Sequence, residues 1–315
     1  MEDEDKDKDE DSKNNKEEKI DIDTIKKIYK AGYSAVKEAA SYVKPGVKLL
    51  DVAERIEHNI IEQGYNCAFP INLSINEEAA HYTPSFQDEK IFNEKDVIKV
   101  DFGIEEFGIM SDCAVTVDLS GEHADLVDAS KEAIDAALSI IKSGVEVGKI
   151  GQEIENTIKK RNLAPIKNLG GHGLGIHDLH AGPFIPNFNN KDDTKLEEGT
   201  IIAIEPFVTN GKSGIVIEGD TCEIYQLEAE AIVRSQNARK IMSAIINRYK
   251  NEPFAVRWLA NELDSKFGLY SSISEIFRTG ALNAYPVLLE QSKGLVAQTE
   301  VNVLVGTDSC ELLTK

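Results

Sequence analysis

Apolar residues recur with helical spacing over four stretches between residues 21 and 161. Helices are predicted, in order, at about residues 21–43, 50–63, 123–142 and 148–161. Asp21 or Asp23 can cap the first of these helices, and Pro45 stops it. In the second helix, Val52, Ile56 and Ile60 fall on one face and predict a side packed against a core.

Runs of β-branched and apolar residues predict strands between and after these helices. The strands fall at 97–104, 108–118, 200–208 and 294–306, with strand and loop at 66–82 and a strand pair at 214–226. The region from about 228 to 290 interrupts the pattern with helix signals and is interpreted as a small helical insertion. The mixture of elements predicts the α/β (α+β) fold class.

The two halves of the chain contain an internal repeat. SYVKPGVKLLDVAERIEHNIIEQ, starting at Ser41, matches SIIKSGVEVGKIGQEIENTIKKR, starting at Ser139. Downstream, EKDVIKVDF (94–102) aligns with EGTIIAIEP (198–206), which sets Asp101 against Glu205. Two such halves facing each other would bring their acids to a shared cleft. One pseudo-symmetric domain over residues 20–315 is therefore expected, and not two independent domains.

Composition and charge exclude several classes of protein. The chain has 315 residues, 41% of them hydrophobic, and a formal net charge of -20, which argues against a general nucleic-acid binder. No apolar run approaches the roughly 18 residues of a membrane span, and the N-terminus has no apolar signal region. Four scattered cysteines predict free thiols in a reducing, cytoplasmic compartment. Residues 1–19 are almost entirely charged, and a disordered solubility tail is expected there.

Three of the six histidines lie in one glycine-rich stretch, KNLGGHGLGIHDLHAG at 167–182. They are His172, His177 and His180. Glycine allows a backbone to approach a ligand closely, and this stretch is predicted to be a loop. A histidine cluster in such a loop suggests a metal or a reacting carbonyl group.

Four carboxylates lie in or beside apolar strands of both halves, where an unpaired charge is costly. Together with His172 they form a candidate metal-ligand set: Asp101, Asp112, Glu205 and Glu300. Oxygen-rich sets of this kind suit Mn, Fe, Co or Zn. Four carboxylates balance two divalent ions better than one, and a water bridging two ions is acidified to a hydroxide nucleophile. His81 and His180 remain outside the set, and either could hold a carbonyl oxygen or stabilise an oxyanion.

Five motifs in order resemble the methionine aminopeptidases of type 2. They are FPINLSINEEAAHYTP, VDFGI…SDCAVTV, NLGGHG…LHAG, AIEPF and VAQTE, and a long helical insertion precedes the last. The resemblance covers roughly Asp21 to the C-terminus and implies the pita-bread fold, in which two pseudo-symmetric halves enclose a dinuclear metal site. The family commonly has Phe before and His after the last glutamate, whereas this chain has Thr299 and Val301.

The resemblance also implies roles for individual residues. The metal ligands would be Asp101, Asp112, His172, Glu205 and Glu300. His81 matches the histidine near the substrate amide, His180 the one that contacts the scissile carbonyl, and Phe69 and Tyr285 the lining of the methionine pocket. Glu205 would also be the proton shuttle.

The activity implied is removal of the N-terminal methionine from nascent proteins, with a preference for a small second residue. A hydroxide bridging two Co, Mn, Fe or Zn ions would attack the first peptide bond. The nascent chain is the expected partner, the ribosome a second one, and a cytoplasmic monomer that binds neither membrane nor nucleic acid is expected. Two alternatives stay open: a proline-specific peptidase of the same fold, such as aminopeptidase P or prolidase, and a non-catalytic relative that binds the ribosome or RNA.

Overall fold

The computed structural model describes residues 21–314, so the expectation of a disordered tail at residues 1–19 falls outside the described residues. The helices are α1 (Ile22–Tyr42), α2 (Leu49–Glu62), α3 (Ala124–Leu138), α4 (Val147–Lys159), α5 (Gln236–Arg248) and α6 (Lys266–Phe277), with a 3-10 helix η1 at Val256–Glu262. Asp21 caps α1 as predicted, because its Oδ1 accepts a hydrogen bond from the Thr24 N–H at 2.9 Å. None of the helices in this part of the chain is long and apolar enough to cross a membrane.

The strands form small antiparallel sheets. In the first half, β2 (Asn72–Ile75), β4 (Val97–Phe102) and β7 (Cys113–Asp118) form one sheet in the order β2-β4-β7. The second half contains a five-stranded sheet in the order β10 (Asp178–Pro186), β9 (Gly170–Gly175), β11 (Ile201–Ile204), β19 (Val301–Val305) and β20 (Cys310–Leu312).

Four further sheets, each of three strands, are the remaining sheets in the described part of the chain. Their strand orders are β1 (Asn66–Cys67), β5 (Ile104–Glu106), β6 (Ile109–Met110); β18 (Val296–Gln298), β12 (Phe207–Thr209), β8 (Ala164–Pro165); β13 (Val216–Glu218), β17 (Leu288–Glu290), β3 (Glu78–Ala80); and β15 (Phe254–Ala255), β14 (Ile224–Leu227), β16 (Leu282–Tyr285).

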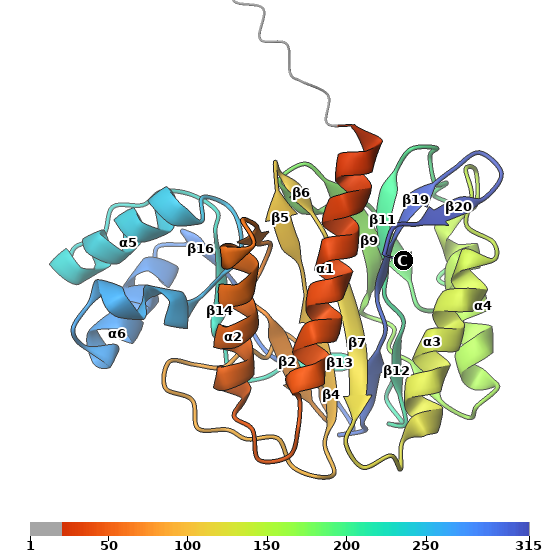
Figure 1. Cartoon of the computed structure of the whole chain (residues 1–315), viewed down its shortest axis with the longest axis horizontal. Helices are drawn as coiled ribbons and strands as arrows, with labels where there is room; N and C mark the ends of the chain where they lie inside the picture. The colour runs from red at the N-terminus through yellow and green to blue at the C-terminus, as the bar shows by residue number, and fades with distance from the viewer. Residues whose placement is uncertain (1–20, 315) are drawn as a thin grey trace, which may run out of the picture.

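The internal repeat has the same local structure in both halves. Gly46 and Gly144 precede α2 and α4 with φ of 83° and 82°, a conformation that favours glycine. The Gly46 N–H donates to the Phe92 carbonyl at 2.8 Å, and the Gly144 N–H donates to the Leu196 carbonyl at 2.8 Å. Each half then packs its helix pair over a sheet, α1 and α2 over the first core and α3 and α4 over the second (Figure 1).

The two halves meet along a strand pairing at the centre of the molecule. The Ala114 N–H donates to the Glu300 carbonyl at 3.3 Å, and the Glu300 N–H donates back to the Ala114 carbonyl at 2.9 Å. The Thr116 hydroxyl adds a bond to the Gln298 carbonyl at 2.7 Å. The edge strand β7 of the first half is thus placed next to Glu300 of the second half.

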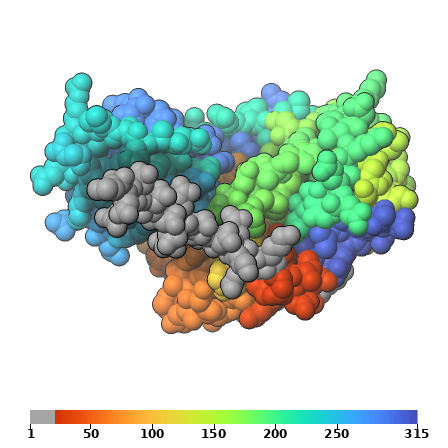
Figure 2. All heavy atoms as spheres, turned by 90° about the horizontal axis from the view of Figure 1, so that it is seen from above, coloured from red at the N-terminus to blue at the C-terminus, as the bar shows by residue number. Residues whose placement is uncertain are grey.

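The helical segment after β14 forms a third group with its own apolar core, built around α5, α6 and η1 and running from Val233 to Leu282. These helices lie to the side of α2 in Figure 1 and occupy one end of the molecule in the view from above (Figure 2). Trp258, the single tryptophan, is partly buried against this core. Arg257 joins the group to the first half through an ion pair with Glu57 on α2.

Several predicted strands are broken, and each break marks a change of sheet. The stretch 200–208 divides into β11 and β12, 294–306 into β18 and β19, and 108–118 into β6 and β7. The predicted pair at 214–226 is wrong, because β13 pairs with β17 whereas β14 pairs with β15 and β16. The predicted loop at 167–182 is also wrong, since it forms most of the antiparallel hairpin β9–β10.

Candidate active site

The glycines of residues 167–182 are required because β9 packs closely between two neighbouring strands, β10 and β11. A Cβ atom on Gly171 would lie 2.2 Å from the Ala203 carbonyl oxygen on β11. A Cβ atom on Gly173 would lie 1.9 Å from the Ala181 carbonyl oxygen on β10. Real Cβ atoms do not approach this closely, so only glycine permits the pairing on both sides. His172 is therefore fixed between them on a central strand.

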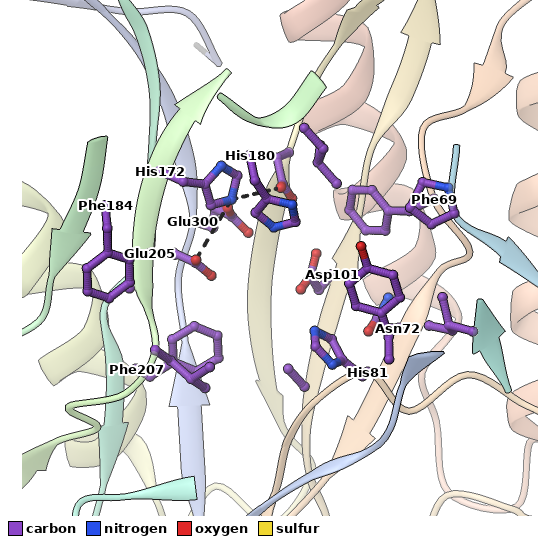
Figure 3. A pocket seen from close by; sticks show the side chains of 18 of the residues that line it. Phe69, Asn72, His81, Asp101, His172, His180, Phe184, Glu205, Phe207 and Glu300 are labelled. Atoms are coloured by element: carbon purple, nitrogen blue, oxygen red, sulfur yellow. Dashed lines mark ion pairs between the residues drawn. The ribbon is translucent and has the colours of Figure 1, made fainter. Parts of the chain in front are cut away.

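The four acids converge with His172 on one cavity of about 360 Å³ (Figure 3). Asp101 lies within β4, but the other three lie at the breaks between strands: Asp112 before β7, Glu205 after β11, and Glu300 between β18 and β19. At these breaks the chain changes sheet, and the structure brings the side chains of both halves into the space between the sheets.

Hydrogen bonds orient the candidate ligands from behind. His172 Nδ1 donates to the Gly173 carbonyl at 3.2 Å, which leaves the lone pair on Nε2 free. That Nε2 lies 3.4 Å from Asp112 Oδ2 and 3.9 Å from Glu205 Oε1. Fully buried Gln298 places its side-chain amide 3.3 Å from Asp101, 3.2 Å from Glu205 and 3.4 Å from Glu300.

The donor set fits a divalent cation. Asp101 Oδ1 and Glu300 Oε1 are buried and have no hydrogen-bond partner. Burial, and then the charge of neighbouring carboxylates, raises the pKa of Asp101, Glu205 and Glu300 well above the ordinary range. Donor atoms of Asp112, His172 and Glu300 all lie within 4.8 Å of one another. Orphaned, mutually repelling carboxylate oxygens of this kind are stabilised by a bound metal ion.

Two further histidines line the cavity outside this set. Burial lowers the pKa of His81 to about 4, and burial followed by the charge of His172 lowers the pKa of His180. His81 Nδ1 donates to the Pro286 carbonyl at 3.2 Å, so its Nε2 is an acceptor. The ring of His180 lies 4.5 Å from that of His172 between centroids. Because their pKa values are lowered, the imidazoles of His81 and His180 are neutral at pH 7.

Most of the remaining wall of the cavity is apolar, apart from Asn72 and Asn168. Phe69, Phe207 and Tyr285 line it together with Leu179 and Phe184 (Figure 3). The Tyr285 ring stands edge-on to His81 with the centroids 5.6 Å apart. The cavity can therefore hold an apolar side chain next to a polar reacting group.

Sequence reasoning missed two side chains at this site. Gln298 lies two residues before Glu300, and the only available signal was a polar residue in an apolar strand. Fully buried Asn302 accepts from the Asp112 N–H at 3.0 Å and donates to the Asp112 carbonyl at 2.7 Å. Both act on residues far away in sequence, which a single sequence does not reveal.

The two residues beside Glu300 that differ from the family pattern, Thr299 and Val301, point away from the cavity. Thr299 makes a 2.7 Å hydrogen bond between its hydroxyl and that of Ser130 on α3. Val301 is 5% exposed and packs in the core of the second half. Neither is among the described residues that line the cavity. His177 also lies outside it and borders a neighbouring cavity.

A metal-dependent hydrolase of peptides is the class that this fold and donor set define. The family model for metallopeptidase family M24 matches residues 23–224, more than half of the chain. The chain therefore belongs to metallopeptidase family M24, and its fold is the pita-bread fold expected from the resemblance.

One relative and two solved structures illustrate the match. The chain is 47% identical over 281 residues to the methionine aminopeptidase of Archaeoglobus fulgidus, which covers 89% of this chain and 94% of the relative. A thermophilic Arx1 superposes with a TM-score of 0.79 at 17% identity, covering 93% of this chain and 91% of that one. The methionine aminopeptidase of Rickettsia prowazekii gives 0.67 at 19% identity, covering 92% and 95%. At these identities the two structures show the fold alone.

Proposed function

We propose that the chain is a methionine aminopeptidase of type 2, which removes the N-terminal methionine from nascent proteins and peptides. One observation supports this proposal above the others: four carboxylates and His172 adjoin an apolar wall inside one cavity. The similarity to an archaeal methionine aminopeptidase over most of both chains supports the same activity. The helical group after β14 supports the type 2 assignment, because an insertion of this kind is expected of that type.

Two divalent ions are proposed to occupy the cavity, with Co, Mn, Fe and Zn all compatible with the donors. Asp101, Asp112, His172, Glu205 and Glu300 would hold them. Such ions polarise a carbonyl group and acidify a bound water at neutral pH. The orphaned oxygens of Asp101 and Glu300 support this ligand set.

The side chains outside the ligand set would position the substrate and move its proton. Phe69 and Tyr285 would hold the methionine side chain against the apolar wall. His81 Nε2, an acceptor, would hold an N–H of the substrate near the scissile bond. Neutral His180 would donate to the carbonyl oxygen and stabilise the oxyanion that forms. Glu205 would pass a proton to the leaving amine.

The proposal extends to the setting of the reaction. The substrate is the N-terminus of a nascent chain with a small second residue, the preference that the resemblance implies. We infer a cytoplasmic monomer that works near the ribosome and has no direct contact with nucleic acid. Residues 20–315 would form a single catalytic domain, with a helical insertion at about 228–290.

The test is release of methionine from Met-Ala-Ser by chelator-treated protein, with each ion restored separately. Activity is expected to return with at least one of the ions. H180A and E205Q are expected to lose at least about a hundredfold in kcat. The matched control is H58A, because His58 is exposed and pairs only with Glu62 on the same helix. Full activity of E205Q would refute the assigned role of Glu205.

The alternative is a proline-specific peptidase, since such enzymes of this fold share the ligand set. The same preparation is therefore offered peptides with Pro in the second position. Cleavage of these peptides without release of methionine from Met-Ala-Ser would overturn the main proposal. A non-catalytic relative would release no methionine with any ion, and E205Q and H180A would leave its binding function intact.

A further inference from the structure

A second group of metal-ligating side chains lies outside the cavity just described. Glu105 belongs to β5 in the first half, His177 to the turn between β9 and β10 in the second half, and Glu252 to the loop between α5 and β15. One donor atom of each lies within 4.8 Å of the others. His177 Nδ1 is 3.8 Å from Glu252 Oε1. Three parts of the chain thus place an imidazole and two carboxylates at one point.

Each of the three residues is held in place by contacts from outside the group. Asn66 donates to Glu105 Oε2 at 2.7 Å, and the Gly108 N–H donates to Glu105 Oε1 at 2.6 Å. The His177 N–H donates to the Gly108 carbonyl at 2.8 Å, and a Cβ on Gly108 would lie 2.7 Å from His177 Nε2. The imidazole therefore rests on Gly108 and presents Nδ1 to Glu252. Outer hydrogen bonds of this kind orient metal ligands.

The charges in the group favour a cation. Glu105 is 5% exposed, and its negative charge acts on Glu252 at close range. Burial first, and then Glu105, raises the pKa of Glu252, while His177 opposes the rise. Two carboxylates facing one imidazole leave a surplus of negative charge. One imidazole and two carboxylates are also ligands that Zn²⁺ accepts.

The group borders a cavity of about 220 Å³ that adjoins the catalytic one. His177 and Glu252 line it together with His180, Leu179 and Tyr285, which also line the catalytic cavity. Glu105, His177 and Glu252 do not themselves line the catalytic cavity. An ion bound by them would therefore be separate from the catalytic ions but within reach of solvent through this space.

We propose that Glu105, His177 and Glu252 form an additional divalent-cation site of the zinc type, which fastens the β9–β10 turn to the loop between α5 and β15. His180 follows His177 by three residues on the same hairpin. Occupancy of the site restricts the motion of this hairpin and changes the turnover of substrate. The effect on turnover rests on the proposed function, whereas binding of the ion does not.

The test is a titration of the full chain with Zn²⁺ against a coloured zinc chelator, after the catalytic ions have been restored. Wild type is expected to bind one more zinc ion per chain than H177N or E252Q. Asparagine suits the left-handed backbone at His177, where φ is 53°, and glutamine matches the shape of glutamate. The control is H58N, which removes the exposed imidazole beside Glu62 and is expected to keep the additional ion.

Equal zinc binding by wild type, H177N and E252Q would overturn the inference, as would loss of the ion in H58N. Circular dichroism spectra matching wild type are required of each variant, and the two variants alter different parts of the chain. In the activity assay, the additional zinc is expected to change methionine release at least twofold in wild type and to leave E252Q unaffected. Absence of methionine release from every preparation would refute the proposed function. The zinc titration would still decide whether the additional site exists.

Discussion

Arg257→Met is expected to weaken the fold more than other single substitutions between the helical group and the first half. Arg257 on η1 pairs with Glu57 on α2, and their side chains are 3% and 7% exposed. The guanidinium also donates to the Thr83 hydroxyl at 2.7 Å and to the Pro84 carbonyl at 3.1 Å. These acceptors follow directly after His81 and Tyr82, so one side chain joins three segments of the chain.

The expected loss in the free energy of unfolding follows from the buried Glu57 carboxyl, which the substitution leaves without its ion-pair partner. Without Arg257, Glu57 keeps only the Trp258 indole at 2.8 Å and the Ile71 N–H at 3.3 Å as donors, and the buried carboxyl takes up a proton. Protonating it at pH 7, against an ordinary pKa of 4.5, costs about 3.4 kcal/mol at about 1.36 kcal/mol per unit. Because burial already raises the pKa of Glu57 in wild type, this figure is an upper limit. We therefore expect a loss of about 2–3.4 kcal/mol, near the lower end for broken buried pairs.

The assay is urea unfolding followed by circular dichroism, at pH 7 and pH 5. The loss is expected to shrink by about 1.4 kcal/mol per pH unit on acidification, because the folded variant binds a proton that the unfolded carboxyl, with its ordinary pKa of 4.5, largely does not bind over this range. The double variant E57Q/R257M has no buried charge and is expected to recover all but about 1–1.5 kcal/mol, the cost of the acceptors on Thr83 and Pro84. A loss below about 1 kcal/mol in R257M, or a double variant less stable than R257M, would refute the reasoning.

Three further outcomes follow from the structure. The kcat/KM for Met-Ala-Ser is expected to show no titration of His81 between pH 6 and 8, because the pKa of His81 is about 4. Only near that lower pH does protonation of Nε2 remove its capacity to accept a hydrogen bond. A step in kcat/KM near pH 6.5 that H81A abolishes would contradict this expectation. Calorimetry is expected to show that chelator-treated protein melts at a lower temperature than reloaded protein, since an ion at a hundred times its Kd stabilises the fold by about 2.7 kcal/mol; equal melting temperatures would argue against the ligand set. Gly173→Ala is expected to cost at least about 2 kcal/mol and to weaken metal binding, because its Cβ would lie 1.9 Å from the Ala181 carbonyl oxygen. The control for this variant is Gly121→Ala, which has φ of 71° but no atom within 4 Å of its Cβ and is expected to cost only about 1 kcal/mol; equal losses in urea would show that the close approach is unimportant.

Much of the candidate site could be predicted because its residues are recognisable from their immediate neighbours in the sequence. A carboxylate such as Asp101 between Val100 and Phe102 is costly in an apolar strand, and that cost signals a ligand without any tertiary information. The repeat around Gly46 and Gly144 likewise predicts two similar halves, and the structure has the same turn in both. All nine predicted site residues line the same cavity, although their roles stay predictions.

Other features depend on partners that sequence periodicity does not identify. The stretch at 167–182 has a loop composition, yet it forms most of the hairpin β9–β10, because β10 and β11 approach β9 from both sides and only glycine fits between them. Gln298 and Asn302 gain their significance from acids up to 197 residues away. The strand breaks at Glu205 and Glu300 follow from which sheet each segment joins, and not from local propensity.

The sequence by itself determined the number of halves, the helices and the kinds of side chain that meet at the cleft. These properties depend on spacing and on the free energy of burying a charge, both of which are read within a few residues. Only the tertiary structure decided which strands pair and how the acids are oriented. It also decided that Glu105, His177 and Glu252 meet, because their proximity arises from the packing of three segments against one another.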